Sequence, residues 1–428
     1  MQDKTGKSRI SSLSPKSSVI RHLIFFTRCI TINSVSYTYD IYLTYKVTEE
    51  FIMAEKGVTT ITLKKINKKK VYQYIYHERQ TSKLQIVRDL EMGLSTVSQN
   101  LNALEAEGLI ERNGYFESTG GRKAQIIRII PDVKISIGIG LLKNMFHIVA
   151  VNLYGEEIDS DTFPLTYSNT ENYYSQVTEK IDNFIQEHHY EKEKILGISI
   201  ATQGIISPDG AAVTYGAIMD NSKMVLSDFA SRLPYPCRLA HDSKAAAYLE
   251  LWSRPSLDSA VVFLLNRNLG GAVITDHKVQ HGISMHSGSL EHMCINPDGP
   301  LCYCGSRGCL ETYCSANALE AAAGMAIKEF FPLLRSKADK NLNQIWNDYL
   351  DHLAFAMKNL NMIIDGPIII SGYLAPYFIP EDIDYLLKYI NNSTPFPVAQ
   401  ENLLIGTRGQ YAPATGAALF YIEQFLKA

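Results

Sequence analysis

The chain has 428 residues, of which 46% are hydrophobic and 20% charged, a composition typical of a globular protein with two or three domains. No run of 18 or more apolar residues occurs, so no membrane-spanning helix is expected. The seven cysteines are an odd number, and five of them lie between residues 294 and 314, unlike an evenly spread disulfide framework. We therefore expect a cytoplasmic protein whose clustered thiols stay reduced and bind a metal.

The formal net charge of −3 is unevenly distributed along the chain. Residues 53–130 carry 13 Lys and Arg against 8 Asp and Glu, and residues 1–52 carry 7 against 4. The rest of the chain carries 21 basic and 32 acidic side chains. A basic N-terminal part before an acidic body favours a polyanionic partner, although an ordinary solvated surface would also explain the charge alone.

Residues 1–52 are rich in Ser, Thr and Tyr and show no sustained helical period. Regular patterning begins after Met53. We expect the protein to start at Met53, so that the preceding stretch is either an untranslated upstream segment or a disordered tail.

Two helices are predicted next, in "KKINKKKVYQYIYHERQ" (residues 64–80) and "TSKLQIVRDL" (residues 81–90). Ser82 is the expected N-cap of the second helix, and Gly93 in "EMGL" is expected to form a tight turn after it. The side chains expected to face the core of this pair are Val71, Tyr74, Ile75, Leu84, Val87 and Leu90.

A third helix is predicted in "STVSQNLNALEAEGLI", with Val97, Leu101 and Leu104 on its buried face. Its other side chains are short and form hydrogen bonds, which suits base edges and phosphates in a DNA major groove. The residues expected to be exposed for this contact are Ser95, Thr96, Ser98, Gln99 and Asn100.

The stretch "LIERNGYFESTGGRKAQIIRI" then predicts a hairpin, or wing, whose tip carries Arg122 and Lys123 toward a minor groove. Helix, turn, polar helix and basic wing follow in the order of a winged helix-turn-helix domain. We predict that residues 53–130 form this domain and bind double-stranded operator DNA. A three-helix bundle that mediates protein contacts is the alternative.

After Pro131 the pattern changes to strands that alternate with helices. The strand-turn-strand pattern of "ISIGIGLL" and its continuation recurs about 125 residues later, in "SAVVFLLNRNLGGAVITDHKV". This repetition predicts a duplicated α/β body over residues 131–428, with a cleft between two lobes.

Three cysteines lie within eight residues in "CYCGSRGCLE", and a histidine precedes them in "SGSLEHM". Together His292, Cys302, Cys304 and Cys309 offer four ligands, which fill a tetrahedral shell and leave no position for water. This pattern predicts a structural Zn²⁺ ion, with glycines 305 and 308 allowing a tight fold around it. Cys294 and Cys314 are close enough in sequence to compete as ligands, and free thiols or a redox pair are the alternative.

The stretch from His292 to Glu311 resembles the zinc signature of the ROK family of repressors, open reading frames and sugar kinases. The resemblance extends from about Thr62 to the C-terminus and includes the winged helix of the repressor branch. It implies a two-lobed, actin-like body of the ribonuclease-H type, the ATPase fold, in which a zinc loop borders a sugar pocket between the lobes. It also implies an oligomer, a homodimer or homotetramer.

The resemblance assigns sugar contacts residue by residue. In "AHDSKAAAYLELW", Asp242 matches the aspartate that serves the kinases as general base, and His241 replaces the usual asparagine. In "SGSLEHM", His292 matches the family motif, but Ser289 stands where a sugar-binding glutamate belongs and Glu291 replaces a glycine. The implied ligand contacts are His241, Asp242, His292 and Glu311.

Two of these residues have a structural alternative. Asp242 precedes a helix expected to begin near Ser243, so it would also serve as a helix cap. Glu311 follows the last zinc cysteine and would also brace a zinc ligand.

The phosphate-binding loops depart furthest from the family pattern. Family kinases carry Asp-x-Gly-Gly-Thr at the first strand turn, where this chain has residues 140–144, "GLLKN". The second loop, usually Gly-Thr-Gly, is Asn266-Arg267-Asn268. With the carboxylate and most glycines absent, phosphoryl transfer is not expected, and Asp242 is a vestigial base position.

These features predict a non-enzymatic, sugar-responsive transcriptional regulator, a repressor, that binds a sugar or sugar derivative in its cleft. A sugar kinase of the ROK type with a DNA-binding domain is the alternative. A third hypothesis is a DNA-binding or scaffold protein whose pocket no longer binds a ligand.

Overall fold

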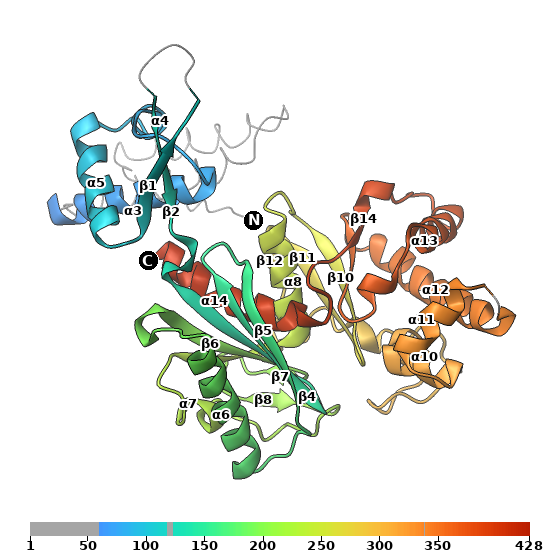
Figure 1. The fold of residues 1–428 in the computed structure, drawn as a ribbon. Coiled ribbons are helices and arrows are strands. Elements are labelled where there is room, and N and C mark those ends of the chain that lie inside the picture. The colour runs from blue at the N-terminus through green and yellow to red at the C-terminus, as the bar shows by residue number, and fades with distance from the viewer. Residues whose placement is uncertain (1–59, 118–122, 338) are drawn as a thin grey trace, which may run out of the picture. The chain divides into compact units, whose positions relative to one another are not determined.

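A computed structural model describes residues 60–117, 123–337 and 339–428 of the chain (Figure 1). The predictions for residues 1–52, for a start at Met53 and for Arg122 lie outside these residues. None of the described helices is long and apolar enough to cross a membrane.

The N-terminal part contains three helices and a hairpin in the predicted order. Ser82 caps the second helix as predicted, because its hydroxyl accepts a hydrogen bond of 3.3 Å from the Gln85 amide. The left-handed residue of the following turn is Glu91, with φ of 53°, whereas Gly93 has φ of −61° and begins the third helix. The elements are α3 (Thr60–Glu78), α4 (Lys83–Asp89), α5 (Leu94–Ala106), β1 (Ile110–Tyr115) and β2 (Gln125–Ile129).

The core of these helices differs from the prediction in α4. Leu84 is 67% exposed, and Ile86 is the fully buried residue of this helix. A helix turns by about 100° per residue, so positions 84 and 86 point in nearly opposite directions and only one of them can face the core. Other buried side chains of the three helices are Val71, Tyr72, Ile75, Val97, Leu101 and Leu104.

The body contains two five-stranded sheets with the same topology. Figure 1 shows the second sheet, with β10 and β11, apart from the first, with β4 and β5. The first has the order β5-β4-β3-β6-β9, and the second has the order β12-β11-β10-β13-β14. In each sheet the first three strands along the chain form an antiparallel meander, and the last two add parallel to its first strand. The predicted duplication is therefore confirmed.

The strand bounds follow this duplication. The first sheet comprises β3 (Ile135–Leu141), β4 (Met145–Asn152), β5 (Glu157–Pro164), β6 (Ile195–Thr202) and β9 (Cys237–His241). The second comprises β10 (Ala260–Leu265), β11 (Leu269–Thr275), β12 (Lys278–Val279), β13 (Ile368–Ser371) and β14 (Leu403–Ile405). A small pair, β7 (Ile205–Ile206) and β8 (Val213–Tyr215), lies in the loop after β6.

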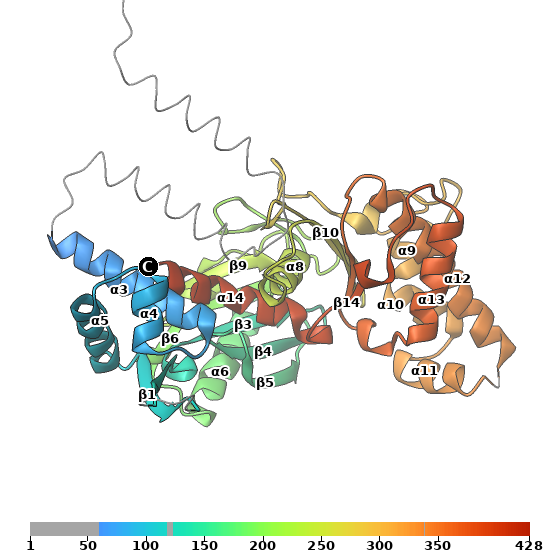
Figure 2. The same cartoon turned by 90° about the horizontal axis from the view of Figure 1, so that it is seen from above.

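Each sheet leads from its last strand into a helix, and these two helices pack against one another. They are α8 (Asp242–Ser253) and α14 (Ala412–Lys427), which lie side by side in Figures 1 and 2. Their contact is close because Gly416 has no side chain: a Cβ atom there would lie 1.8 Å from the Ala245 carbonyl oxygen. The contact between the two helices holds the first turn of α8 in place, and this turn borders the candidate site.

The remaining helices cover the outer faces of the sheets. Apolar side chains of α6 pack on the first sheet, and those of α10 to α13 form the core of the second lobe. Their bounds are α6 (Glu171–Glu187), α7 (Ser227–Ala230), α9 (Glu311–Cys314), α10 (Ala316–Ala323), α11 (Ile327–Arg335), α12 (Lys340–Asn361) and α13 (Pro380–Asn392).

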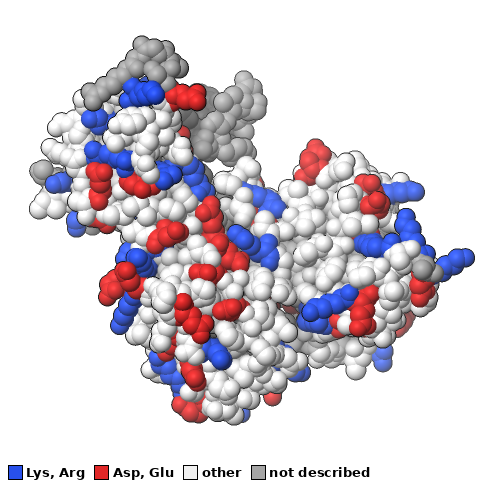
Figure 3. Space-filling model, viewed as in Figure 1, with Lys and Arg blue, Asp and Glu red and all other residues white. Residues whose placement is uncertain are grey.

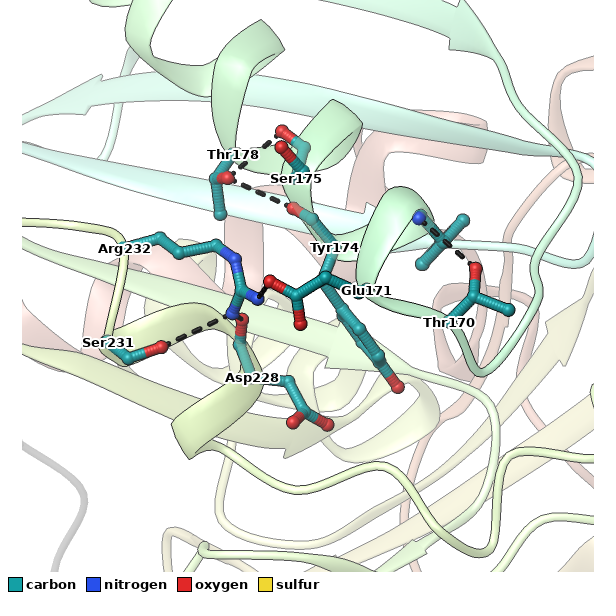
Figure 4. A network of polar contacts seen from close by, with 9 residues as sticks. Thr170, Glu171, Tyr174, Ser175, Thr178, Asp228, Ser231 and Arg232 are labelled. Atoms are coloured by element: carbon teal, nitrogen blue, oxygen red, sulfur yellow. Dashed lines mark hydrogen bonds and ion pairs between the residues drawn. The ribbon is translucent and has the colours of Figure 1, made fainter.

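A polar network joins α6 to α7 in the first lobe (Figure 4). Thr170 caps α6 by accepting a 3.3 Å hydrogen bond from the Tyr173 amide. Arg232, just after α7, forms an ion pair with Glu171 and donates to the Asp228 carbonyl. Because the Glu171 side chain is largely exposed, we expect the ion pair to contribute little to stability and mainly to hold the two helix ends together.

Charged side chains of both signs are mixed on the face of the body that Figure 3 shows. The negative balance of residues 131–428 is therefore spread among interspersed charges on this face. It does not form a single acidic patch there.

Candidate functional site

The candidate pocket depends on two glycines at the start of β11. A Cβ atom on Gly270 would lie 2.3 Å from the Ser243 hydroxyl, and one on Gly271 would lie 2.3 Å from the Leu290 side chain. The bare backbone thus lets the start of α8 and the short 3₁₀ helix Leu290–His292 pack directly on the strand. Both segments carry predicted site residues to the same place.

The pocket draws its walls from the first lobe, the second lobe and residues 290–311, which contain the candidate metal ligands and form the metal loop. His241, Asp242 and His292, three of the four predicted ligand contacts, are among the lining residues. The lining comprises Gln203, Gly204, Ile205, Tyr215, Ala217, Ile218, His241, Asp242, Ser243, Leu269, Gly270, Ser289, Glu291, His292 and Tyr303.

Asp242 is buried at the first residue of α8 and lines the pocket. Its Oδ1 atom accepts a hydrogen bond of 2.7 Å from the Ser243 amide and lies 3.4 Å from His241 Nδ1. Burial lowers the pKa of His241, against the opposing effect of Asp242, so this imidazole is neutral near pH 7. Asp242 therefore accepts a hydrogen bond at the N-terminus of its helix and also borders the cavity.

Glu291 is a site residue that the sequence marked as a departure from the family motif without assigning it a role. It lines the pocket beside Ser289, and its Oε2 atom is buried without a hydrogen-bond partner among the described residues. Burial, with a contribution from Asp242, raises the pKa of Glu291 to about 8. The chain thus has a carboxyl group in this pocket two residues after Ser289, the position where the resemblance implies one.

Lys244 lies near these carboxyl groups on the first turn of α8 but does not line the pocket. Its side chain is buried, and its ammonium group donates to the Ser287 carbonyl. Burial lowers the pKa of Lys244 to about 8, while Glu291 and Asp242 oppose this shift. The cation nearest to the two acids is therefore already bound to the backbone.

Glu311, the fourth ligand contact that the resemblance implied, is not among the residues that line this pocket. Its Oε1 accepts from Asn268 Nδ2 at 2.7 Å, and its Oε2 accepts from the Leu269 amide at 2.6 Å. Burial raises the pKa of Glu311 to about 7. Because both oxygens bond the β10–β11 turn, Glu311 ties the segment after the last cysteine to the second lobe.

The predicted metal ligands come together in space. The donor atoms of His292, Cys302, Cys304 and Cys309 all lie within 4.8 Å of one another. Cys304 Sγ is 3.7 Å from Cys309 Sγ, and Cys302 Sγ is 3.9 Å from His292 Nδ1. In a tetrahedral site with metal–sulfur bonds of about 2.3 Å, two sulfur atoms are about 3.8 Å apart, so this donor set fits zinc.

The two competing cysteines are not part of this group. Cys294 is exposed, and its thiol donates to the Arg307 carbonyl at 3.5 Å. Cys314 is fully buried in the helical core, where its thiol contacts the Tyr349 carbonyl at 3.8 Å.

The metal loop needs glycine at Gly308. This residue has φ of +67°, and a Cβ atom there would lie 1.5 Å from the Asn296 carbonyl oxygen. Burial and the neighbouring cysteines raise the pKa of Cys309 to about 12, so without a cation this thiol stays protonated. A bound divalent cation would reverse that preference, as it does for thiolate ligands generally.

The two loops that match the phosphate-binding positions of the resemblance differ in their contacts. Asn266 Oδ1 accepts a hydrogen bond of 2.8 Å from the Tyr373 amide, and Arg267 forms a 2.5 Å ion pair with Glu320. Lys143 is exposed at the β3–β4 turn. None of these three side chains lines the described pocket.

The prediction for α5 was wrong at Asn100. This residue is 3% exposed, and its amide donates to the Thr96 carbonyl at 2.9 Å. Positions 97, 100, 101 and 104 form one i, i+3, i+4, i+7 stripe, so Asn100 shares the face of the buried apolar residues despite its polarity. Ser95 and Gln99 are exposed as predicted, and Thr96 and Ser98 are half-buried.

Asn102 was not among the predicted contact residues, but it is exposed on the same side of α5 as Ser95 and Gln99, at i+7 and i+3. Its Oδ1 atom accepts a hydrogen bond of 2.6 Å from Arg112 in the hairpin. The helical period alone would have found it. Lys123, at the described edge of the hairpin tip, is exposed as predicted.

Comparisons with known proteins agree with this architecture. The xylose repressor of Caldicellulosiruptor bescii is 26% identical over 351 residues, which cover 77% of this chain and 88% of that protein. The crystal structure of a ROK family transcriptional regulator, a homolog of the E. coli MLC protein, has a TM-score of 0.66 at 19% identity and covers 85% of this chain and 96% of its own.

A ROK glucokinase from Streptomyces griseus, solved with glucose and AMPPNP, has a TM-score of 0.58 at 18% identity and covers 67% of this chain and 98% of its own. At these identities the two structures establish the α/β fold of the body. The sequence profile of the ROK family matches residues 135–424. The chain therefore belongs to the ROK family.

Proposed function

We propose that this protein is a sugar-responsive transcriptional regulator, a repressor, that binds double-stranded operator DNA. The observation that carries the proposal is that α4, a turn, the polar face of α5 and a hairpin precede a ROK body in one chain. A xylose repressor that aligns with 77% of the chain supports the same assignment.

In this proposal residues 53–130 form a winged helix-turn-helix domain, and α5 enters the major groove. Ser95, Gln99 and Asn102 are the side chains most available to bases, and Thr96 and Ser98 contact the DNA with their exposed parts. Arg122 and Lys123 of the wing contact the backbone or the minor groove. The buried Asn100 is left out of this interface.

The pocket would hold the sugar effector, with His241, Asp242 and His292 as contacts. Glu311 would act as a positioning residue, because its carboxylate already bonds the β10–β11 turn. Sugar binding would favour one arrangement of the two lobes and change the spacing of paired winged helices on a palindromic site. The mechanism requires at least a homodimer, and a homotetramer would also satisfy it.

A structural Zn²⁺ ion would be held by His292, Cys302, Cys304 and Cys309. Such an ion supplies no reaction chemistry, because its four protein ligands leave no open position. It would fix the segment between His292, which lines the pocket, and Glu311. A cytoplasmic location fits these free thiols.

The alternative is a sugar kinase, and Asp242 in the pocket is the observation that favours it. Against it, residues 140–144 carry no carboxylate, and Arg267 is paired with Glu320. Incubation with Mg-ATP and a panel of sugars tests this alternative. ADP formation that Asp242→Asn abolishes would establish the kinase.

The regulator is tested by fluorescence anisotropy with DNA from upstream of its own gene and with random DNA of equal length. We expect preferential, salt-sensitive binding to the upstream DNA. Equal affinity for both DNAs at every salt concentration would overturn the proposal.

A further inference from the structure

The pocket carries two carboxyl groups and no fixed positive charge. Asp242 and Glu291 both line it, and no Lys or Arg is found among the described lining residues. Lys244, the nearest cation, donates to the Ser287 carbonyl from a buried position outside the lining. His241 and His292 are the histidines among the described lining residues, and burial lowers the pKa of His241, which favours its neutral form.

We propose that Glu291 is a specificity-determining residue that, together with Asp242, selects an unphosphorylated sugar and excludes sugar phosphates. This inference rests on the proposed sugar-sensing function and names the chemical class of the effector. It assigns a role to Glu291, at a position where the resemblance implies glycine, whereas the implied glutamate position is Ser289 in this chain.

Among the described residues, the Oε2 atom of the Glu291 carboxyl group lacks a hydrogen-bond donor, which a ligand could supply. Glu291 Oε2 is buried, and no described residue donates to it or accepts from it. An unpaired buried polar atom is costly, so a ligand that bonds it gains affinity. Sugar hydroxyl groups, or the ammonium group of an amino sugar, supply donors of the kind that carboxylate oxygens accept.

The charge of the pocket also disfavours a phosphate group. Proteins bind phosphate groups with Arg or Lys side chains, backbone amides or helix N-termini, because two negative charges must be balanced. The N-terminus of α8 points at this pocket, but Asp242 already bonds the amide of Ser243 there. A phosphate in this pocket would meet the Asp242 carboxylate, and no Lys or Arg among the described lining residues would balance the charge. Like charges repel strongly in a desolvated site.

Isothermal titration calorimetry on the full chain tests this inference with four probes: glucose, xylose, glucosamine and glucose 6-phosphate. We expect at least one unphosphorylated probe to bind about a hundredfold more tightly than glucose 6-phosphate. Preference for glucosamine would identify the ammonium group as the donor, and preference for glucose or xylose would identify hydroxyl groups. Equal or tighter binding of glucose 6-phosphate, or binding of none of the four, would overturn the inference.

The role of Glu291 is tested by the Glu291→Gln variant, with Asp298→Asn, an exposed acid of the same loop, as control. We expect the preferred sugar to bind about tenfold or more weakly to Glu291→Gln and unchanged to Asp298→Asn. Unchanged affinity in Glu291→Gln would remove Glu291 from the recognition of the sugar.

Circular dichroism spectra confirm that both variants fold, and the selectivity of the unaltered chain remains decisive if Glu291→Gln does not fold. Binding of upstream DNA is measured in parallel. Retained DNA binding without sugar selectivity would refute this inference alone, whereas loss of specific DNA binding would refute the proposed function.

Discussion

The metal loop differs from the β3–β4 and β10–β11 turns in how many residues it shares with the ROK motifs that the sequence resembles. The metal loop keeps all four donors within 4.8 Å of one another. The β3–β4 turn has no carboxylate, and the β10–β11 turn uses Asn266 and Arg267 for internal contacts. Glu311 joins the two regions, because it follows the metal loop and bonds the β10–β11 turn.

The two regions therefore differ in the chemistry that their side chains offer. The metal loop brings a complete set of metal donors together beside the pocket, whereas Asn266 and Arg267 of the β10–β11 turn form contacts within the protein.

Removal of the metal should have the largest effect. We expect Cys309→Ser to reduce bound zinc from about one ion per chain to near zero and to lower the free energy of unfolding by about 3 kcal/mol or more. Sugar binding should weaken at the same time, because the loop that carries Glu291 and His292 loses its anchor. Atomic absorption and urea denaturation measure the first two quantities, and calorimetry measures the third.

Cys294→Ser is the matched control for this variant, since Cys294 lies in the same loop outside the donor group. It should retain zinc and stability. Complete zinc removal without any change in stability or sugar binding would contradict a structural role of the metal.

Substitution of a glycine in β3, the strand that leads into the β3–β4 turn, should have the next largest effect on stability. A Cβ atom on Gly138 would lie 1.9 Å from the Ala414 carbonyl oxygen, whereas one on Gly140 would meet its nearest neighbour at 3.4 Å. We expect Gly138→Ala to lower the free energy of unfolding by about 2–3 kcal/mol and Gly140→Ala by less than about 1 kcal/mol. Similar urea midpoints for both variants would show that the close packing of α14 on β3 does not determine the stability of the protein.

The free energy of unfolding should also depend on pH through His147, the β4 residue that pairs with Gly140 of β3. Burial lowers its pKa to about 4 from 6.5, so the unfolded chain takes up a proton at a higher pH than the folded chain does. This contribution to stability is therefore present above pH 6.5 and is lost as the pH falls toward 4.

Between pH 7 and pH 5 the loss due to His147 should be about 2 kcal/mol. His147→Gln, which can still bond Thr162, should lack this part of the pH dependence. Urea denaturation of both proteins at the two pH values measures the difference, and parallel pH profiles would refute the assignment.

The smallest effects on stability are expected in α5. Gln99→Ala should weaken binding to upstream DNA by about tenfold without changing the melting temperature. Asn100→Ala should lower the free energy of unfolding by about 1 kcal/mol, because a buried hydrogen bond is lost. An unchanged DNA affinity in Gln99→Ala would remove this face of α5 from the interface.

The success of sequence-based prediction depended on how local each feature was. Three metal ligands lie within eight residues, so ligand chemistry and spacing alone predicted their meeting. The repeated strand-turn-strand pattern predicted the duplicated sheets for the same reason. Asn100 was misplaced because its polarity outweighed its position on the helical stripe of Val97 and Leu101.

The pocket was harder to predict because its residues meet only in three dimensions. Glu291 lines the pocket through the packing of Leu290 on Gly271, and no spacing in the sequence signals this contact. Glu311 was assigned to the ligand by resemblance alone, but its neighbours Asn268 and Leu269 take both of its oxygens. A carboxylate near a pocket contacts the ligand only if its own neighbours leave it an oxygen.

The affinity of the zinc-loaded protein for its own upstream DNA, measured with and without the sugar that calorimetry selects, tests the central claim most directly. The account predicts specific, salt-sensitive binding whose affinity changes when the sugar is added. Binding that does not distinguish upstream from random DNA, or that does not respond to a sugar bound by the same preparation, would contradict it.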